Sequence, residues 1–129
     1  MPPMVTPFYA GFLALLYIAL SARVIKHRRS ARISLGDGND VALQQKIRVQ
    51  SNCAEYAPIG IVLLLLAELQ GAPEWGLHLL GGMLLLGRLS HAVGMGAVPQ
   101  RLNLRIFGMV LTIVMIILAA VGNIAHATF

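Results

Sequence analysis

Four stretches of mostly apolar residues follow one another along the chain, with short polar segments between them. A helix needs roughly 20 apolar residues to cross a bilayer, because the hydrocarbon core is about 30 Å thick and each helical residue rises about 1.5 Å. The sequence therefore predicts an all-α integral membrane four-helix bundle that forms a single domain, residues 1–129. The expected helices cover about 5–25, 43–69, 75–95 and 104–124.

Little of the chain remains outside these stretches. Hydrophobic residues make up 57% of the sequence and charged residues 12%, a balance that would keep a soluble domain poorly dissolved. Any chemistry is therefore expected inside the bundle or at its rim. A cleaved signal peptide is the competing interpretation of the first stretch. No Lys or Arg precedes that stretch, and Arg23, Lys26, Arg28 and Arg29 follow it, which favours a retained helix.

The lysines and arginines gather on one side of the predicted bundle. All ten lie in the first-to-second or third-to-fourth connection or in the adjoining helix ends, and the other side offers only Glu68 and Glu74 as charges. By the positive-inside rule the basic side is cytoplasmic and both termini are non-cytoplasmic. We expect the cluster Lys26 to Arg32 to contact anionic membrane lipids. No nucleic acid partner is expected, because no folded extramembrane surface would present a phosphate-binding patch.

The second predicted helix carries ionisable residues, which are costly in lipid and normally turn inward toward a partner or a cavity. Arg48, Asn52 and Glu55 stand at i, i+4 and i+7, a spacing that places them on one helix face, with Tyr56 beside them. Pro58 removes a backbone donor on the same helix, so a kink is expected next to this polar face. The polar face is a candidate binding site.

The third and fourth predicted helices add further basic residues at the same membrane depth. Arg88, His91 and Met95 stand at i, i+3 and i+7, and Arg101 and Arg105 open the fourth helix. Together with the second helix they form a site that should favour an anionic ligand. The competing interpretation is structural, since arginines at helix ends can neutralise charges between helices or extend to headgroups without binding a ligand.

The remaining candidate ligating residues are isolated. Cys53 is the one cysteine, which excludes an internal disulfide and a thiolate metal cage. His78 and His126 have no second His or carboxylate at ligand spacing, so no metal site is expected. These three residues are interpreted as packing or interfacial positions.

Several of these patterns resemble one family. The run Arg48-Val-Gln-Ser-Asn52-Cys53-Ala-Glu55-Tyr56-Ala-Pro58 is similar to the second-helix signature of the membrane-associated proteins in eicosanoid and glutathione metabolism, or MAPEG, above all in its leukotriene C synthase and microsomal glutathione transferase branches. Gly87-Arg88-Leu-Ser-His91 resembles the third-helix pattern. Leu35-Gly36-Asp37-Gly38 and Arg105-Ile-Phe-Gly108-Met109 look like bacterial members. The resemblance covers essentially the whole chain.

The resemblance implies a homotrimer in a bacterial inner membrane that binds glutathione, its co-substrate, between neighbouring subunits on the cytoplasmic side. Glutathione carries two carboxylates, one ammonium and a thiol. Arginines would hold the carboxylates, Glu55 the ammonium, and neutral groups would supply further hydrogen bonds. The implied glutathione-binding residues are Arg23, Arg48, Asn52, Glu55, Tyr56, Arg88 and His91.

The resemblance also implies thiol activation by an arginine at the start of the fourth helix. Arg105 is the first choice and Arg101 the reserve, because a fixed cation lowers the pKa of a nearby thiol. The implied activity is transfer of glutathione to lipophilic electrophiles, or reduction of hydroperoxides, in detoxification. Met95 replaces a tyrosine that is usual in the family, and another small thiol remains an alternative. The rival prediction is a non-catalytic trimeric scaffold or lipid-binding protein, and a small transporter is a third.

Overall fold

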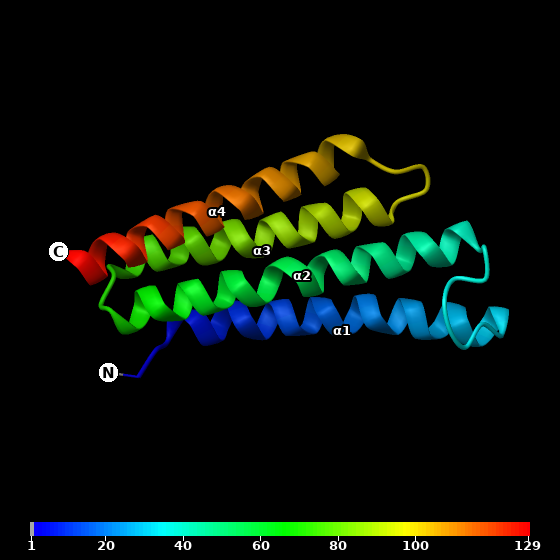
Figure 1. Cartoon of the computed structure of the whole chain (residues 1–129), viewed down its shortest axis with the longest axis horizontal. Helices are drawn as coiled ribbons and strands as arrows, with labels where there is room; N and C mark the ends of the chain where they lie inside the picture. Colours follow the sequence, from blue (N-terminus) through cyan, green and yellow to red (C-terminus); the bar gives the residue numbers. More distant parts are fainter. Residues whose placement is uncertain (1) are drawn as a thin grey trace.

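The computed structural model describes residues 2–129, so residue 1 of the predicted domain lies outside the described part. The chain forms four long helices that run side by side (Figure 1). Each helix is long and apolar enough to cross a membrane, and residues 2–129 contain no strand. The predicted all-α class with four spanning helices is confirmed. The helices are α1 (Val5–Ala31), α2 (Val41–Leu69), α3 (Glu74–Gly96) and α4 (Leu102–Thr128).

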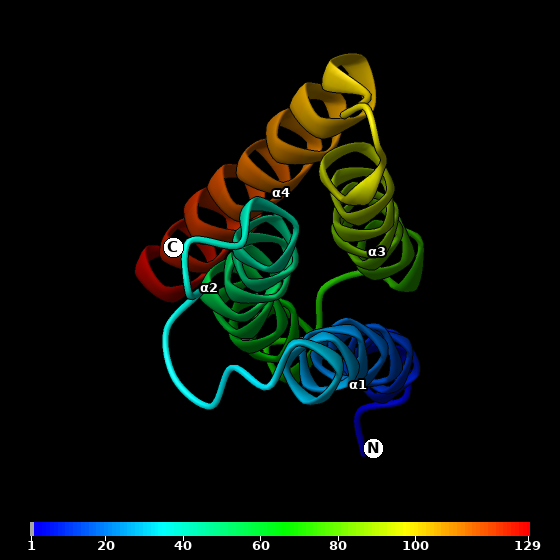
Figure 2. The ribbon, with the colours of Figure 1, turned by 90° about the vertical axis from the view of Figure 1, so that its right-hand side faces the viewer.

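The helices alternate in direction, so the α1–α2 and α3–α4 connections lie at one end of the bundle (Figure 1). The α2–α3 connection and both chain ends lie at the other. The end-on view in Figure 2 shows α1 and α4 on opposite sides of the pair formed by α2 and α3. Both α1 and α4 pack on α2 and on α3. This arrangement gathers the lysines and arginines at one end of the molecule.

The first helix continues beyond its expected end near Ile25 and stops at Ala31. Lys26, Arg28 and Arg29 are charged but remain helical, since leaving the hydrocarbon core does not require a helix to end. Arg32 then takes a left-handed conformation with φ 57° and closes the helix. Asp40 begins α2, where its side chain accepts a hydrogen bond from the backbone N–H of Leu43 at 3.0 Å.

At the opposite end, Glu68 of α2 caps the first turn of α1. Its carboxylate accepts hydrogen bonds from the backbone N–H groups of Met4, Val5 and Thr6 at 2.7, 2.7 and 2.8 Å. The first turn of a helix has no internal acceptors for these donors, so an acid from a neighbouring helix satisfies them. Glu68 therefore fixes where α1 begins relative to α2.

The α3–α4 pair packs over the most extensive contact in the bundle, and glycines face it. A side-chain carbon on Gly94 would collide with the backbone of Arg105, and one on Gly108 would collide with the backbone of His91. A core of buried residues that includes Leu13, Leu64, Leu84 and Met115 joins all four helices. Large apolar side chains cover the outside of the bundle, as expected for a surface in lipid.

Candidate functional site

Arg88 is the centre of the candidate site. Its side chain is 1% exposed, and all three guanidinium nitrogens have partners. Nε donates to Oγ1 of Thr112 at 3.0 Å, Nη1 donates to both oxygens of Asn52, and Nη2 contacts Sδ of Met109 at 3.2 Å. The guanidinium carbon lies 5.3 Å from the centre of the Tyr56 ring, a cation–π contact. Arg88 thus joins α2, α3 and α4 at one point.

Glycine packing lets Arg88 reach these partners. Gly87 precedes it, and a side-chain carbon there would lie 2.7 Å from Oγ1 of Thr112. The hydroxyl of Thr112 donates to the carbonyl of Gly108 at 2.8 Å, so its lone pair is directed at the arginine. Arg88 makes no ion pair with a carboxylate of residues 2–129. Its charge is therefore balanced only by neutral oxygens, a sulfur and an aromatic ring.

Arg48 and Glu55 form a separate pair on α2. Nη1 of Arg48 lies 3.6 Å from Oε1 of Glu55, and both side chains are 52% exposed. Within the described part of the chain, Arg48 is the one Lys or Arg side chain that forms an ion pair with an acid. Two opposite charges are thus held half-exposed on a helix of membrane-spanning length.

The start of α4 carries the two predicted thiol-activating residues. Arg101 is the N-cap, and its backbone N–H donates to the carbonyl of Gly94 at 2.8 Å. Nη1 of Arg105 donates to Oε1 of Gln100 at 3.1 Å. Ser90 of α3 donates to the carbonyl of Leu104 at 2.9 Å and fastens this turn to the bundle. Both guanidinium groups therefore stand on a fixed turn beside the end of α3.

The structure brings some predicted site residues into contact and leaves others apart. Arg88 contacts both Asn52 and Tyr56, and Arg48 pairs with Glu55. His91 is 3% exposed, and its backbone lies in the α3–α4 contact. Arg23 extends toward the end of α3, where a side-chain carbon on Gly96 would lie 3.0 Å from Nη1 of Arg23.

Two residues that complete the environment of Arg88 were not predicted. Thr112 is a lone hydroxyl in an otherwise apolar stretch, and Met109 was noted only as part of a motif. The polar residue in that stretch was the one signal that pointed to Thr112, because a buried hydroxyl needs a partner. It lies one helical turn after Gly108, which faces α3.

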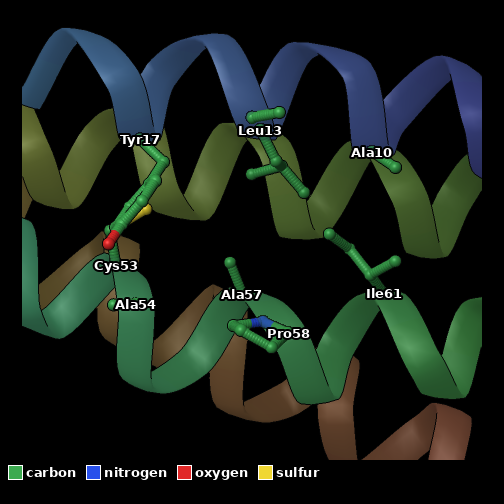
Figure 3. Close-up of a pocket in the computed structure, with 9 residues that line it drawn as sticks. Ala10, Leu13, Tyr17, Cys53, Ala54, Ala57, Pro58 and Ile61 are labelled. Carbon is green, nitrogen blue, oxygen red and sulfur yellow. The ribbon is translucent and has the colours of Figure 1, made fainter.

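A cavity of about 360 Å³ lies between α1 and α2, beside Pro58. Figure 3 shows Leu13 and Tyr17 of α1 across from Cys53 and Ala57 of α2. The remaining lining is apolar, and Cys53 is buried. The cavity stands next to the predicted kink, on the helix that also carries Asn52 and Tyr56.

The sequence of this chain is similar to those of known proteins. Residues 6–125 match the MAPEG family. The chain belongs to the MAPEG family. It is also 44% identical over 91 residues to the inner membrane protein YecN of Escherichia coli strain K12, a match that covers 70% of each chain, and equally to YecN of strain CFT073. The printed name of YecN states a membrane location and no activity. The protein is an integral membrane member of a family associated with glutathione.

Proposed function

We propose that this MAPEG member is a glutathione-dependent enzyme that transfers glutathione to lipophilic electrophiles or reduces lipophilic hydroperoxides. The observation that carries the proposal is the buried Arg88, which orients Asn52 and Tyr56 on the same helix that presents the pair Arg48 and Glu55. A bundle held together by apolar packing alone has no need for the half-exposed charges of Arg48 and Glu55.

The charges of the site match those of glutathione. In the proposal, Arg48 and Arg23 hold the two carboxylates, and Glu55 turns from Arg48 toward the ammonium. Asn52 and Tyr56 contact the peptide groups from positions that Arg88 fixes, and His91 lies behind them in the α3–α4 contact. Ion pairs of this kind are strong when two donors face one carboxylate.

The exposed pair on α2 supports the proposed homotrimer. Arg48 and Glu55 are half-exposed on a single chain, and charged side chains facing hydrocarbon are costly. A neighbouring subunit would cover them and form the second wall of the glutathione site. On the basic side of the bundle this site would face the cytoplasm.

Thiol activation falls to Arg105, with Arg101 as the reserve. The described contact of Arg105 is with the neutral amide of Gln100, so its positive charge is free to stabilise an anion. Close to that guanidinium the glutathione thiol gives its proton to water and remains as thiolate. The thiolate sulfur then bonds to a carbon of an electrophile, where a leaving group departs or the displaced bonding electrons take up a proton from water. With a hydroperoxide it bonds to the terminal oxygen, the O–O bond breaks, and the alkoxide takes a proton from water. A second glutathione then reduces the resulting sulfenic acid, giving glutathione disulfide and water.

The alternative is a non-catalytic trimeric scaffold or lipid-binding protein. The closed hydrogen-bonding shell of Arg88 favours it, because every guanidinium nitrogen already has a protein partner. The two functions differ in thiol binding, since a scaffold has no use for it.

Calorimetry on the purified protein in detergent distinguishes the glutathione-dependent enzyme from the non-catalytic scaffold. The enzyme should bind glutathione, and Arg48→Gln and Glu55→Gln should each weaken binding by about tenfold or more, since hydrogen bonds to charged groups contribute about 1.5–3 kcal/mol. Glu74→Gln, which removes an acid with a side chain that is 82% exposed at the other end, is the control. Absence of binding to glutathione and to other small thiols would favour the scaffold.

A further inference from the structure

A second basic site lies between the C-terminal part of α1 and the first turns of α2. A pocket of about 350 Å³ is lined by Arg23, Lys26, His27 and Ser30 of α1 and by Lys46 of α2. No carboxylate lines it. Lysine, arginine and serine side chains all supply hydrogen-bond donors, so the pocket is built to receive an acceptor-rich anion.

A chain of hydrogen bonds fixes one wall of this pocket. Nζ of Lys46 lies 2.9 Å from Nδ1 of His27, and Nε2 of His27 lies 2.7 Å from Oδ2 of Asp40. An ammonium group can only donate, so Nδ1 accepts and the ring proton is on Nε2, which donates to Asp40. Lys46 is thereby held in place, and two of its three N–H donors remain available to a ligand.

Asp40 does not neutralise the pocket. One of its oxygens caps α2 through the N–H of Leu43, and the other accepts from His27. The hydrogen bonds from His27 and from Leu43 hold the pKa of Asp40 below its ordinary value, so it is a stable anion that orients His27. Arg23, Lys26 and Lys46 form no ion pair with any acid of residues 2–129. Three cations therefore share one opening without a counter-charge.

We propose that this pocket binds the phosphate of an anionic phospholipid headgroup. The pocket begins where the apolar part of α1 ends, just before Ile25, which is the level at which headgroups meet a spanning helix. A headgroup phosphate presents several acceptor oxygens to Lys26, Lys46 and the hydroxyl of Ser30, while its acyl chains stay beside the exposed apolar residues of α1. Basic pockets between helices at this depth suit such headgroups.

The proposal does not depend on the glutathione site. The two sites share Arg23 and no other residue, and the Asp40–His27–Lys46 chain has no part in the glutathione site. A lipid held here would fasten the ends of α1 and α2, next to the contacts of Gln45 of α2 with the carbonyls of Met95 and Ala97.

Native mass spectrometry of the purified full chain can test the site. The probe is phosphatidylglycerol, added to protein in neutral detergent together with an excess of phosphatidylcholine. Lys26→Gln and Lys46→Gln should each weaken phosphatidylglycerol binding about fivefold, the effect of one cation near a membrane surface. The matched control is Arg29→Gln, which removes the same charge from an exposed position outside the pocket. Lys46→Arg keeps the charge and should retain most of the binding.

Three outcomes would overturn the proposal. The first is equal loss of phosphatidylglycerol binding in Lys46→Gln and Arg29→Gln, which would mean diffuse attraction to basic residues. The second is complete displacement of the lipid by inorganic phosphate at millimolar concentration, which would assign the pocket to a soluble phosphoester. The third is displacement by glutathione that persists in Arg23→Gln, which would make the rest of the pocket part of the glutathione site. Circular dichroism identifies any variant that fails to fold, and Lys26→Gln then tests the same pocket from the other helix.

Discussion

Arg88 of α3 donates two hydrogen bonds to Asn52 of α2, one to the side-chain oxygen and one to the backbone carbonyl 3.3 Å away. A buried cation is thus joined to the helix that carries the family signature. The guanidinium is satisfied without any acid, which is uncommon because a buried charge is costly unless it is well hydrogen-bonded.

Thr112→Val should destabilise the bundle. The substitution removes the oxygen that accepts from Nε of Arg88 and leaves a buried N–H without a partner, which costs about 1–3 kcal/mol. We expect a lower midpoint in thermal unfolding followed by fluorescence. Thr128→Val is the matched control, because Thr128 makes the same hydroxyl-to-carbonyl bond to Ile124 at an exposed end of α4. Equal shifts in the two variants would contradict a special role for the Arg88 contact.

Glu68→Gln should loosen the start of α1. The glutamine side chain lacks the negative charge of the carboxylate, which accepts hydrogen bonds from the backbone N–H groups of Met4, Val5 and Thr6. Hydrogen exchange of these three amides should become about tenfold faster, because hydrogen bonds to a charged group contribute about 1.5–3 kcal/mol. Glu74→Gln should leave these rates unchanged, and unchanged rates in Glu68→Gln would show that the cap does not hold α1.

Gly108→Ala should weaken the α3–α4 contact. The added carbon would collide with the backbone of His91, which cannot move aside without separating the helices. Overpacking of this kind costs about 1–3 kcal/mol. Gly122→Ala on the same helix meets nothing within 4 Å and should be neutral or slightly stabilising, since Ala favours the helix. Thermal unfolding of the two variants compares them directly, and a neutral Gly108→Ala would disprove the close approach.

Acid should destabilise the connection between α1 and α2 through Asp40. Hydrogen bonds from His27 and from the backbone of Leu43 hold its pKa below the ordinary 3.8. A depressed pKa stabilises the fold above the ordinary value, and this contribution disappears as the pH falls through the lower folded value. Asp40→Asn keeps a good N-cap without the charge. The variant should therefore lose less stability than the wild type when unfolding is followed from neutral pH to about pH 3. If the stability of Asp40→Asn and of the wild type fell equally with pH, this role of the Asp40 charge would be contradicted.

The sequence alone predicted those features of the fold that depend on residues close together along the chain. The apolar stretches identified the spanning helices, because length and hydropathy suffice for that. The spacing of Arg48, Asn52 and Glu55 placed them on one helix face, and the family match agrees with the motif they form.

Contacts between helices could not be predicted in the same way. The shell of Thr112 and Met109 around Arg88 depends on which faces of α3 and α4 meet, and that is decided by glycines far apart in the sequence. Glu68 was read only as a charge on the non-cytoplasmic side, although it caps α1 from a distance of more than sixty residues. The roles of Arg101 and Arg105 stay predictions, because they concern a ligand.

Thiol activation can be measured as the difference absorbance of bound glutathione at about 240 nm, where thiolates absorb. We expect a thiolate band at neutral pH in wild-type protein in detergent, and its loss in Arg105→Ala, with Arg101→Ala measured beside it. Loss in Arg101→Ala alone would move the activating role to that residue. Glutathione bound without a thiolate band in the wild type would contradict thiol activation and leave a binding protein in place of an enzyme.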